Sequence, residues 1–371
     1  MTQIATQGGV KLVPRALDPT DIMFGCAFFA TRWGGPAQDV VNQVVHSALE
    51  YGIVDFDTAP AYGDSEDKLG VALANSPLGG NAVVITKAGK LIRRLDPHTA
   101  VVGSLPPKPW SPMAVKDSER VWIGNYTDMG AMMSFSESME RMGLSTCDTL
   151  RVHDPDTIEG AVASAKAPNG IVAGLLNLRR LGLIKNVSIG VNVNPYHVSV
   201  TPGTGGVLGT PWNGPSEILS MVNAFPAGTF KSVLLAYGWN LGSQDGWKIM
   251  QELHSRNIEV HLAGVFYGIY HTRGGCADAP PEERKKILAK MAKWKALAAK
   301  YNFSIQTVAF GFAFLPSCVT KLVVGMKNKT EFDMNMKEIE AAKSIPIDLW
   351  KEAHAQKLLS GEVPMISGKC H

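Results

Sequence analysis

Four side chains that can together move a proton to or from a substrate oxygen follow short apolar runs of the sequence: Asp57, Tyr62, Lys87 and His153. A tyrosine hydroxyl ordinarily has a pKa of about 10. A neighbouring lysine ammonium stabilises the phenolate and lowers that pKa, while a carboxylate holds the ammonium in place. Tyr62 could then exchange a proton with a carbonyl or alcohol near neutral pH, while His153 polarises the same oxygen. Carbonyl reduction and alcohol oxidation by hydride transfer both need this chemistry.

Each of these residues also has an ordinary structural explanation when it is taken alone. Asp57 could cap a turn, and Tyr62 could pack beside a glycine. Lys87 could be a solvated strand end, and His153 could satisfy a loop. The catalytic interpretation therefore depends on elements that carry all four side chains to one place.

Short apolar runs alternate with helix-like segments along the chain, as strands buried on both faces should. The runs predict strands over residues 22–28, 53–56, 82–86, 149–152, 187–191, 232–236, 258–265 and 321–325. Helical spacing is found between them, for example over residues 39–51, 158–181 and 281–301. Eight such units indicate an α/β fold, a (β/α)8 TIM barrel. A doubly wound open sheet is the alternative, but no Gly-x-Gly-x-x-Gly follows the first strand.

Two Pro- and Gly-rich segments interrupt the alternation, at about residues 89–125 and 195–215. A barrel needs about 250 residues, so these insertions and a C-terminal extension over about 341–371 account for the remaining length of one domain, 1–371. The insertions follow the third and fifth strands, at the end where such barrels build active sites. We expect aromatic residues in or beside them to wall the substrate pocket: Trp110, Trp122, Tyr126 or Trp212.

The composition favours a globular enzyme over a nucleic-acid or membrane protein. The 371 residues are 19% charged and carry a formal net charge of only +3, without a basic footprint. The five cysteines form no CxxC pair, so we expect reduced thiols and no metal site. The N-terminus lacks an apolar signal region, and the apolar stretch 305–326 is interrupted by polar residues and a proline. These features predict a cytoplasmic protein without a membrane partner.

Residues 57–66 read Asp-Thr-Ala-Pro-Ala-Tyr-Gly-Asp-Ser-Glu and resemble the motif of the aldo-keto reductase superfamily, Asp followed by Ala-x-x-Tyr-Gly-x-Ser-Glu. The resemblance extends over most of the chain, from about residue 22 to residue 335. It implies that Tyr62 is the general acid/base, that Asp57 and Lys87 tune it, and that His153 orients the carbonyl. Residues 126–130, 138–144 and 152–156 are similar to the aldose 1-dehydrogenase branch, which includes D-threo-aldose and pyridoxal dehydrogenases.

The same resemblance implies a nicotinamide cofactor and the residues that hold it. Asn192 or Asn194, with a slight preference for Asn194, takes the place of the usual Ser-Asn pair at the nicotinamide amide. The other residues implied at the cofactor are Phe266, Tyr267, Gly325, Lys327, Lys329 and Asn335. Glu331 would repel a 2′-phosphate while the two lysines would attract one, so the charges leave NAD and NADP both open. Trp239 is either a pocket wall or a core residue.

These features predict an NAD(P)-dependent oxidoreductase of carbohydrate metabolism. It would transfer hydride between nicotinamide and an aldehyde, an aldose, or the corresponding hemiacetal or alcohol. The expected partner is a small carbonyl or sugar substrate, with no nucleic acid. The alternative is a cofactor-binding, redox-sensing subunit of a larger assembly, because such subunits can keep all four residues.

Overall fold

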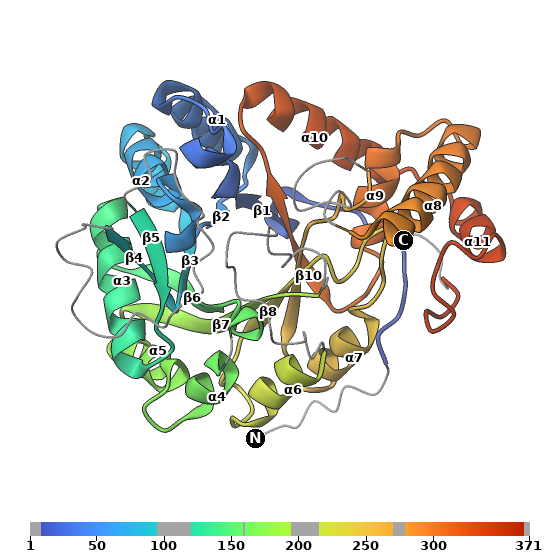
Figure 1. The fold of residues 1–371 in the computed structure, drawn as a ribbon. Helices are drawn as coiled ribbons and strands as arrows, with labels where there is room; N and C mark the ends of the chain where they lie inside the picture. The colour runs from blue at the N-terminus through green and yellow to red at the C-terminus, as the bar shows by residue number, and fades with distance from the viewer. Residues whose placement is uncertain (1–8, 95–119, 159, 194–214, 270–278, 367–371) are drawn as a thin grey trace, which may run out of the picture.

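The computed structural model describes residues 9–94, 120–158, 160–193, 215–269 and 279–366. Parallel strands form a closed barrel in the order β1-β10-β9-β8-β7-β6-β3-β2, and helices surround it (Figure 1). The barrel strands are β1 Ile22–Gly25, β2 Asp55–Asp57, β3 Val83–Ala88, β6 Cys147–His153, β7 Ile184–Asn192, β8 Ser232–Ala236, β9 Glu259–Ala263 and β10 Val319–Gly325. Each predicted strand overlaps one of them, and the predicted TIM barrel is confirmed.

The helices follow the strands and bury their apolar sides on the barrel. They are α1 Gln38–Tyr51, α2 Ser65–Asn75, α3 Asp128–Met142, α4 Ala161–Lys166, α5 Ile171–Arg180, α6 Pro215–Asn223, α7 Trp247–Ser255, α8 Pro281–Lys300, α9 Ile305–Ala313, α10 Lys329–Ala342 and α11 Ile347–Ala355. Helix α8 illustrates the pattern, because Met291, Trp294, Leu297 and Ala298 are buried at helical spacing. Its first turn carries Glu282 and Glu283, which suit a helix N-terminus.

Two predicted elements differ from the structure. The single helix expected over 158–181 is two helices, α4 and α5, because Pro168 and Gly170 fall between them. A side chain at position 170 would also meet the carbonyl oxygen of Ser164 at 2.3 Å. The first strand ends at Gly25 rather than at Phe28, and the chain continues as a 3-10 helix over Cys26–Phe29.

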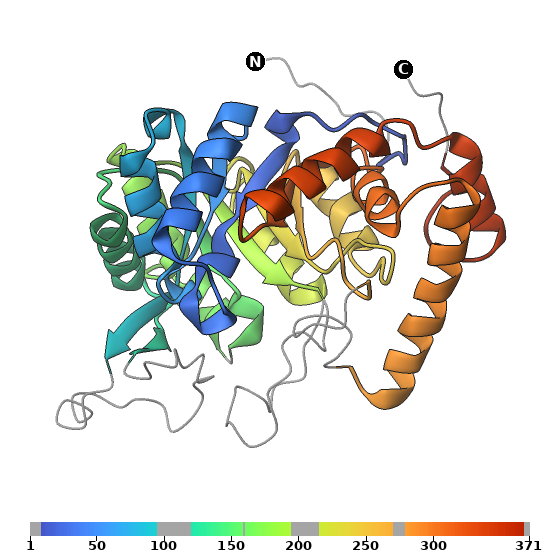
Figure 2. The ribbon, with the colours of Figure 1, turned by 90° about the horizontal axis from the view of Figure 1, so that it is seen from above.

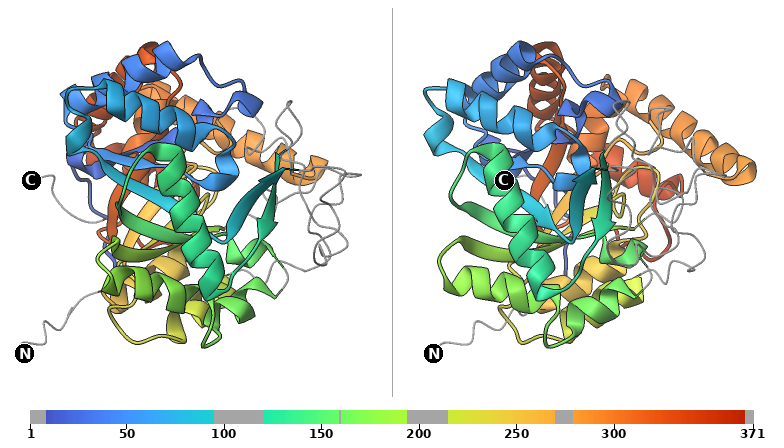
Figure 3. Two further views of the ribbon diagram at one scale, coloured as in Figure 1. Left: turned by 90° about the vertical axis from the view of Figure 1, so that its left-hand side faces the viewer. Right: turned by 60° about the vertical axis from the view of Figure 1, so that its left-hand side comes forward.

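The ends of the first predicted loop form an antiparallel hairpin of β4 Lys90–Arg94 and β5 Arg120–Gly124. Leu91 and Trp122 are buried, which explains why this part of a loop-like segment pairs as strands. In Figure 2 the teal hairpin projects from the barrel at the lower left, whereas the orange helix α8 begins at the lower right. Figure 3 shows α3 beside it, consistent with the contact between α3 and β4. The hairpin extends the barrel at the C-terminal end of β3.

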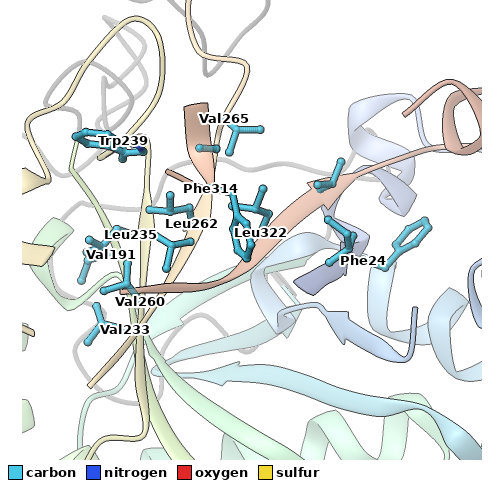
Figure 4. Close-up of a cluster of buried hydrophobic side chains, with 14 of the residues drawn as sticks. Phe24, Val191, Val233, Leu235, Trp239, Val260, Leu262, Val265, Phe314 and Leu322 are labelled. Carbon is cyan, nitrogen blue, oxygen red and sulfur yellow. The ribbon is translucent and has the colours of Figure 1, made fainter. Parts of the chain in front are cut away.

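Aliphatic side chains of β7, β8 and β9 form one part of the core (Figure 4), including Val191, Val233, Leu235, Val260 and Leu262. Trp239 joins the same core and is completely buried. Its ring stacks on Phe312 at 4.8 Å between centroids, and its Nε1 donates to the Phe312 carbonyl. Trp350 of α11 also contacts Phe312, so α11, within the C-terminal extension, packs onto the core.

No helix in the described part of the chain is long and apolar enough to cross a membrane. The cysteines that the structure describes, Cys26, Cys147 and Cys318, are free and buried.

Candidate active site

A buried ion pair between Asp57 and Lys87 lies at the C-terminal ends of β2 and β3. The Nζ of Lys87 donates to Asp57 Oδ1 at 2.5 Å and to the Thr58 carbonyl at 2.7 Å. Both residues are at most 3% exposed. Burial lowers the pKa of Lys87, and the Asp57 carboxylate opposes that shift by stabilising the ammonium.

Tyr62 ends the 3-10 helix Pro60–Tyr62, directly after β2. The following Gly63 has φ of +67°, a conformation that favours glycine and turns the chain into α2. The Lys87 ammonium lies 4.7 Å from the centroid of the Tyr62 ring. The ring of Trp33 lies 5.7 Å from the same tyrosine ring and packs against it at a tilt. Tyr62 therefore lies next to the buried ion pair.

His153 is the last residue of β6 and is 4% exposed. Its ring meets the Tyr62 ring edge-on, with 5.7 Å between centroids. The hydroxyl of Tyr126 donates to the His153 carbonyl at 2.5 Å, which fixes the backbone at this strand end. Gly89 has φ of +110°, and a side chain there would lie 2.6 Å from the Tyr126 ring. The structure thus brings the four predicted residues, Asp57, Tyr62, Lys87 and His153, to one end of the barrel.

Arg151 joins this group from inside the barrel, and sequence reasoning missed it. Its Nε lies 3.2 Å from Asp57 Oδ2, so Asp57 contacts two cations, Lys87 and Arg151. It is fully buried, and burial lowers its pKa while Asp57 opposes the shift. The signal in the sequence is a charge inside a buried strand, two residues before His153 and therefore on the same face.

Asp154, the residue after His153, forms a second polar cluster at the barrel end. Its Oδ2 lies 2.7 Å from Lys90 Nζ and 3.4 Å from His153 Nε2, and its Oδ1 accepts from Asn192 Nδ2 at 3.0 Å. Burial favours a raised pKa, but the charges of Lys90 and His153 outweigh it and lower the pKa of Asp154 to about 2. Burial and the Asp154 charge raise the pKa of Asp156 to about 8. Asp154 is therefore the ionised member of this pair of carboxyl groups at neutral pH.

Trp122 covers this cluster from the hairpin. Lys90 Nζ lies 4.9 Å from the centroid of its ring, and Trp122 is 8% exposed. Tyr126 is 4% exposed and contacts the His153 backbone, as described above. Trp110, Trp212 and Asn194 lie outside the described residues.

The remaining predicted cofactor residues lie around the same barrel end. Tyr267 is buried and packs edge-on against Tyr237, while Phe266 packs edge-on against Phe310. Gly325 ends β10, and Lys329 begins α10, where it pairs with Asp333 at 2.6 Å. Half-buried Asn335 lies further along α10.

The start of α10 suits the anionic part of a dinucleotide. Asn328 caps the helix by accepting from Glu331 N at 2.9 Å, and Glu331 accepts from Lys327 N at 2.8 Å. Lys327 Nζ donates to the Trp33 carbonyl and lies 5.7 Å from the half-exposed Phe28 ring, facing no carboxylate within the described ranges. A helix N-terminus with a nearby ammonium and an open aromatic face can hold phosphate and adenine groups. Among the described residues, no three His, Cys, Asp or Glu side chains are grouped to hold a metal ion.

His261 of β9 lies on the other side of Arg151 and is expected to make folding stability depend on pH. Its Nδ1 accepts from the Arg151 guanidinium at 2.8 Å, so the imidazole is neutral. Burial lowers the pKa of His261 from 6.5 to about 4, although Glu259 opposes the shift. Between these values only the unfolded chain binds the proton, so stability falls as the pH falls from 6.5 to 4, by on the order of 3 kcal/mol.

The test is urea unfolding across this pH range for the wild type and for His261→Gln, which keeps an acceptor for Arg151. The variant is expected to lose less stability on acidification. Equal pH slopes for the two proteins would contradict the expectation, because only the wild type carries the titrating imidazole at position 261.

Comparisons with known proteins agree with this fold. The model of the aldo/keto reductase family matches residues 21–200. A D-threo-aldose 1-dehydrogenase from a Pseudomonas species is 32% identical over 348 residues, covering 91% of this chain and 93% of the relative. A pyridoxal 4-dehydrogenase from Microbacterium luteolum is 26% identical over 342 residues, with coverages of 86% and 88%. The structure of a glycerol dehydrogenase from Gluconobacter oxydans superimposes with a TM-score of 0.63 at 18% identity, covering 94% of each chain.

The barrel and these relatives define the class of the protein as an NAD(P)-dependent oxidoreductase. The chain belongs to the aldo/keto reductase family, and its similarity extends to the aldose and pyridoxal dehydrogenase branch expected from the sequence.

Proposed function

We propose that this enzyme oxidises an aldose at its hemiacetal carbon, or catalyses the reverse reduction, with Tyr62 as the general acid/base. The observation that supports this role most directly is the position of Lys87, whose ammonium bonds Asp57 and lies 4.7 Å from the Tyr62 ring. An ammonium this close stabilises a tyrosine phenolate and makes proton transfer near neutral pH possible.

In the oxidation, the substrate hydroxyl loses its proton to the Tyr62 oxygen while the carbon–hydrogen bond breaks and the carbonyl forms. A nicotinamide bound at this barrel end would supply the acceptor for the hydride, which balances the two-electron oxidation of the sugar. His153 donates a hydrogen bond to the same substrate oxygen and orients it. The Asp57 carboxylate positions the Lys87 ammonium, and this ammonium stabilises the Tyr62 phenolate that accepts the proton.

The residues that the resemblance names would hold the two halves of the cofactor on different sides of the barrel mouth. Lys327 and the α10 N-terminus would bind phosphate, Asn335 would contact adenine, and Asn192 or Asn194 would bind the nicotinamide amide. Because Lys329 is paired with Asp333 and Glu331 bonds the Lys327 backbone, Lys327 is the more available cation for a phosphate.

The experiment is a matrix of NAD and NADP against aldoses, simple aldehydes and their alcohols, followed by nicotinamide absorbance. Turnover of aldoses with one or both cofactors is expected. Absence of turnover on every substrate would refute the proposal. Elution of the native protein in a large assembly, together with that absence, would favour the cofactor-binding subunit instead.

The cluster of Asp154, Lys90 and Asn192 supports a polyhydroxylated substrate. A carboxylate and an ammonium beside His153 offer both an acceptor and a donor to sugar hydroxyls, and Trp122 supplies an aromatic face next to them. Hydrogen bonds to charged groups contribute about 1.5–3 kcal/mol each.

Asp154→Asn is therefore expected to lower kcat/KM for an aldose by about 10- to 100-fold, while changing it much less for an aldehyde without hydroxyl groups. Steady-state kinetics on the two substrates measure the difference. The matched control is Asp148→Asn, a carboxylate at the opposite end of β6 that pairs with Lys185. An equal loss for both substrates would show that Asp154 acts on His153 and does not bind the sugar.

A further inference from the structure

Arg151 introduces a second buried positive charge beneath the site. Its position on β6 is the register partner of Lys87 on β3, and both side chains contact Asp57. The guanidinium is fully buried, and each of its three nitrogen atoms donates a hydrogen bond. Its other partners within the barrel are Ser188 Oγ at 2.6 Å, Ser232 Oγ at 3.3 Å, His261 Nδ1 at 2.8 Å and Met23 Sδ at 3.7 Å.

These other partners are neutral. Ser188 and Ser232 are small residues on neighbouring strands, and they leave room for the guanidinium while supplying hydroxyl acceptors. His261 is neutral because its Nδ1 accepts from the guanidinium. Arg151 therefore has its hydrogen bonds satisfied, but Asp57, the only carboxylate bonded to it among the described residues, is shared with Lys87.

The other charged groups near this cluster have partners of their own or are neutral. Asp55 pairs with Lys321, Glu259 pairs with Lys231, and Asp154 contacts both Lys90 and His153, the histidine that packs against Tyr62. The Cys26 thiol is buried, and burial raises its pKa far above the usual range, so it stays protonated. One carboxylate thus faces two buried cations, which leaves one excess positive charge next to Tyr62.

We propose that Arg151 is a positioning residue that fixes the Asp57 carboxylate and supplies this excess positive charge, and so favours the phenolate form of Tyr62. The inference rests on the proposed acid/base role of Tyr62. It extends that role by setting the pH range in which Tyr62 can act as the base. Oxidation needs Tyr62 as a base, and a surplus cation makes the deprotonated form accessible at lower pH.

The decisive experiment compares Ser188→Asp with Ser188→Asn, two side chains of nearly the same shape that differ in charge. The introduced carboxylate would accept a hydrogen bond from the Arg151 guanidinium and neutralise the excess charge. The amide oxygen can accept the same hydrogen bond but carries no negative charge. The ionisation of Tyr62 is followed by the ultraviolet absorbance of its phenolate in the protein without substrate. The same titration of each variant combined with Tyr62→Phe is subtracted, so that only the Tyr62 signal remains.

We expect the pKa of Tyr62 to be higher in Ser188→Asp than in Ser188→Asn by at least about one pH unit. Arg151→Met is expected to raise it similarly, and Arg151→Lys to restore most of the wild-type value. The alkaline shift should also be seen in the pH profile of kcat/KM for oxidation. Equal pKa values in the two Ser188 variants would overturn the proposal and leave Arg151 with a purely structural role.

The Ser188 pair keeps the test valid if Arg151→Met does not fold, since the arginine is present in both variants. The titration needs no turnover, so it also separates this inference from the proposed function. A shifted pKa in a protein that oxidises no sugar would refute the aldose activity but not the effect of Arg151. Sugar oxidation together with an unshifted pKa of Tyr62 would support the aldose activity and refute the effect of Arg151.

Discussion

Tyr62→Phe is expected to lower kcat by about 10²- to 10⁴-fold while leaving the affinity for the nicotinamide cofactor unchanged. Only the hydroxyl is removed, and the phenyl ring can keep its packing against Trp33 and His153. The loss should therefore appear in the chemical step and not in folding or binding. Single-turnover absorbance measures the step, and fluorescence titration measures cofactor binding.

Tyr51→Phe is the matched control, because Tyr51 is an exposed tyrosine at the end of α1 that packs on Phe332. It should turn over like the wild type. Wild-type turnover in Tyr62→Phe would remove the acid/base role. Loss of cofactor binding in that variant would show that the hydroxyl has a different task.

Asp57→Asn is expected to lower the free energy of unfolding by about 3–5 kcal/mol, since it leaves Lys87 and Arg151 buried without their shared carboxylate. The amide still fits the space, so the loss is electrostatic and not a cavity effect. Urea unfolding at neutral pH measures it. Turnover should fall as well, because the Lys87 ammonium loses its main partner.

The control for this variant is Asp333→Asn, which removes a carboxylate from an exposed pair with Lys329. Surface pairs contribute about 1 kcal/mol or less, so its stability should hardly change. If Asp57→Asn proved as mild as Asp333→Asn, the buried cations would have to be compensated by something other than Asp57.

The barrel and the four central residues were predictable from the sequence for a physical reason. Strands covered on both faces are continuously apolar, and their C-terminal ends meet at one mouth, so polar residues after three such runs had to converge. The segment Asp57–Tyr62 and the strand ends at Lys87 and His153 are placed by this rule alone.

The parts that sequence reasoning missed depend on contacts between distant segments. Arg151 lies within a run predicted as an ordinary buried strand, and only the fold shows that Asp57, Ser188 and His261 surround its guanidinium. The hairpin was missed because the Gly- and Pro-rich composition of residues 89–125 predicted a loop, although a few apolar residues lie at the two ends of that segment. The break between α4 and α5 could have been read from Pro168 and Gly170.

The hairpin has a consequence for redesigning this enzyme. Strand β3, which carries Lys87, is separated from the hairpin by Gly89 alone, and the first hairpin residue is Lys90, the partner of Asp154. A hairpin transplanted from a relative would therefore alter the end of the strand that carries Lys87, the lysine next to Tyr62, as well as the position of Trp122. Library designs that exchange this segment should begin after Lys90 and retain Tyr126. New substrate contacts can then be selected while the contacts of Lys90 with Asp154 and of Tyr126 with the His153 backbone are kept.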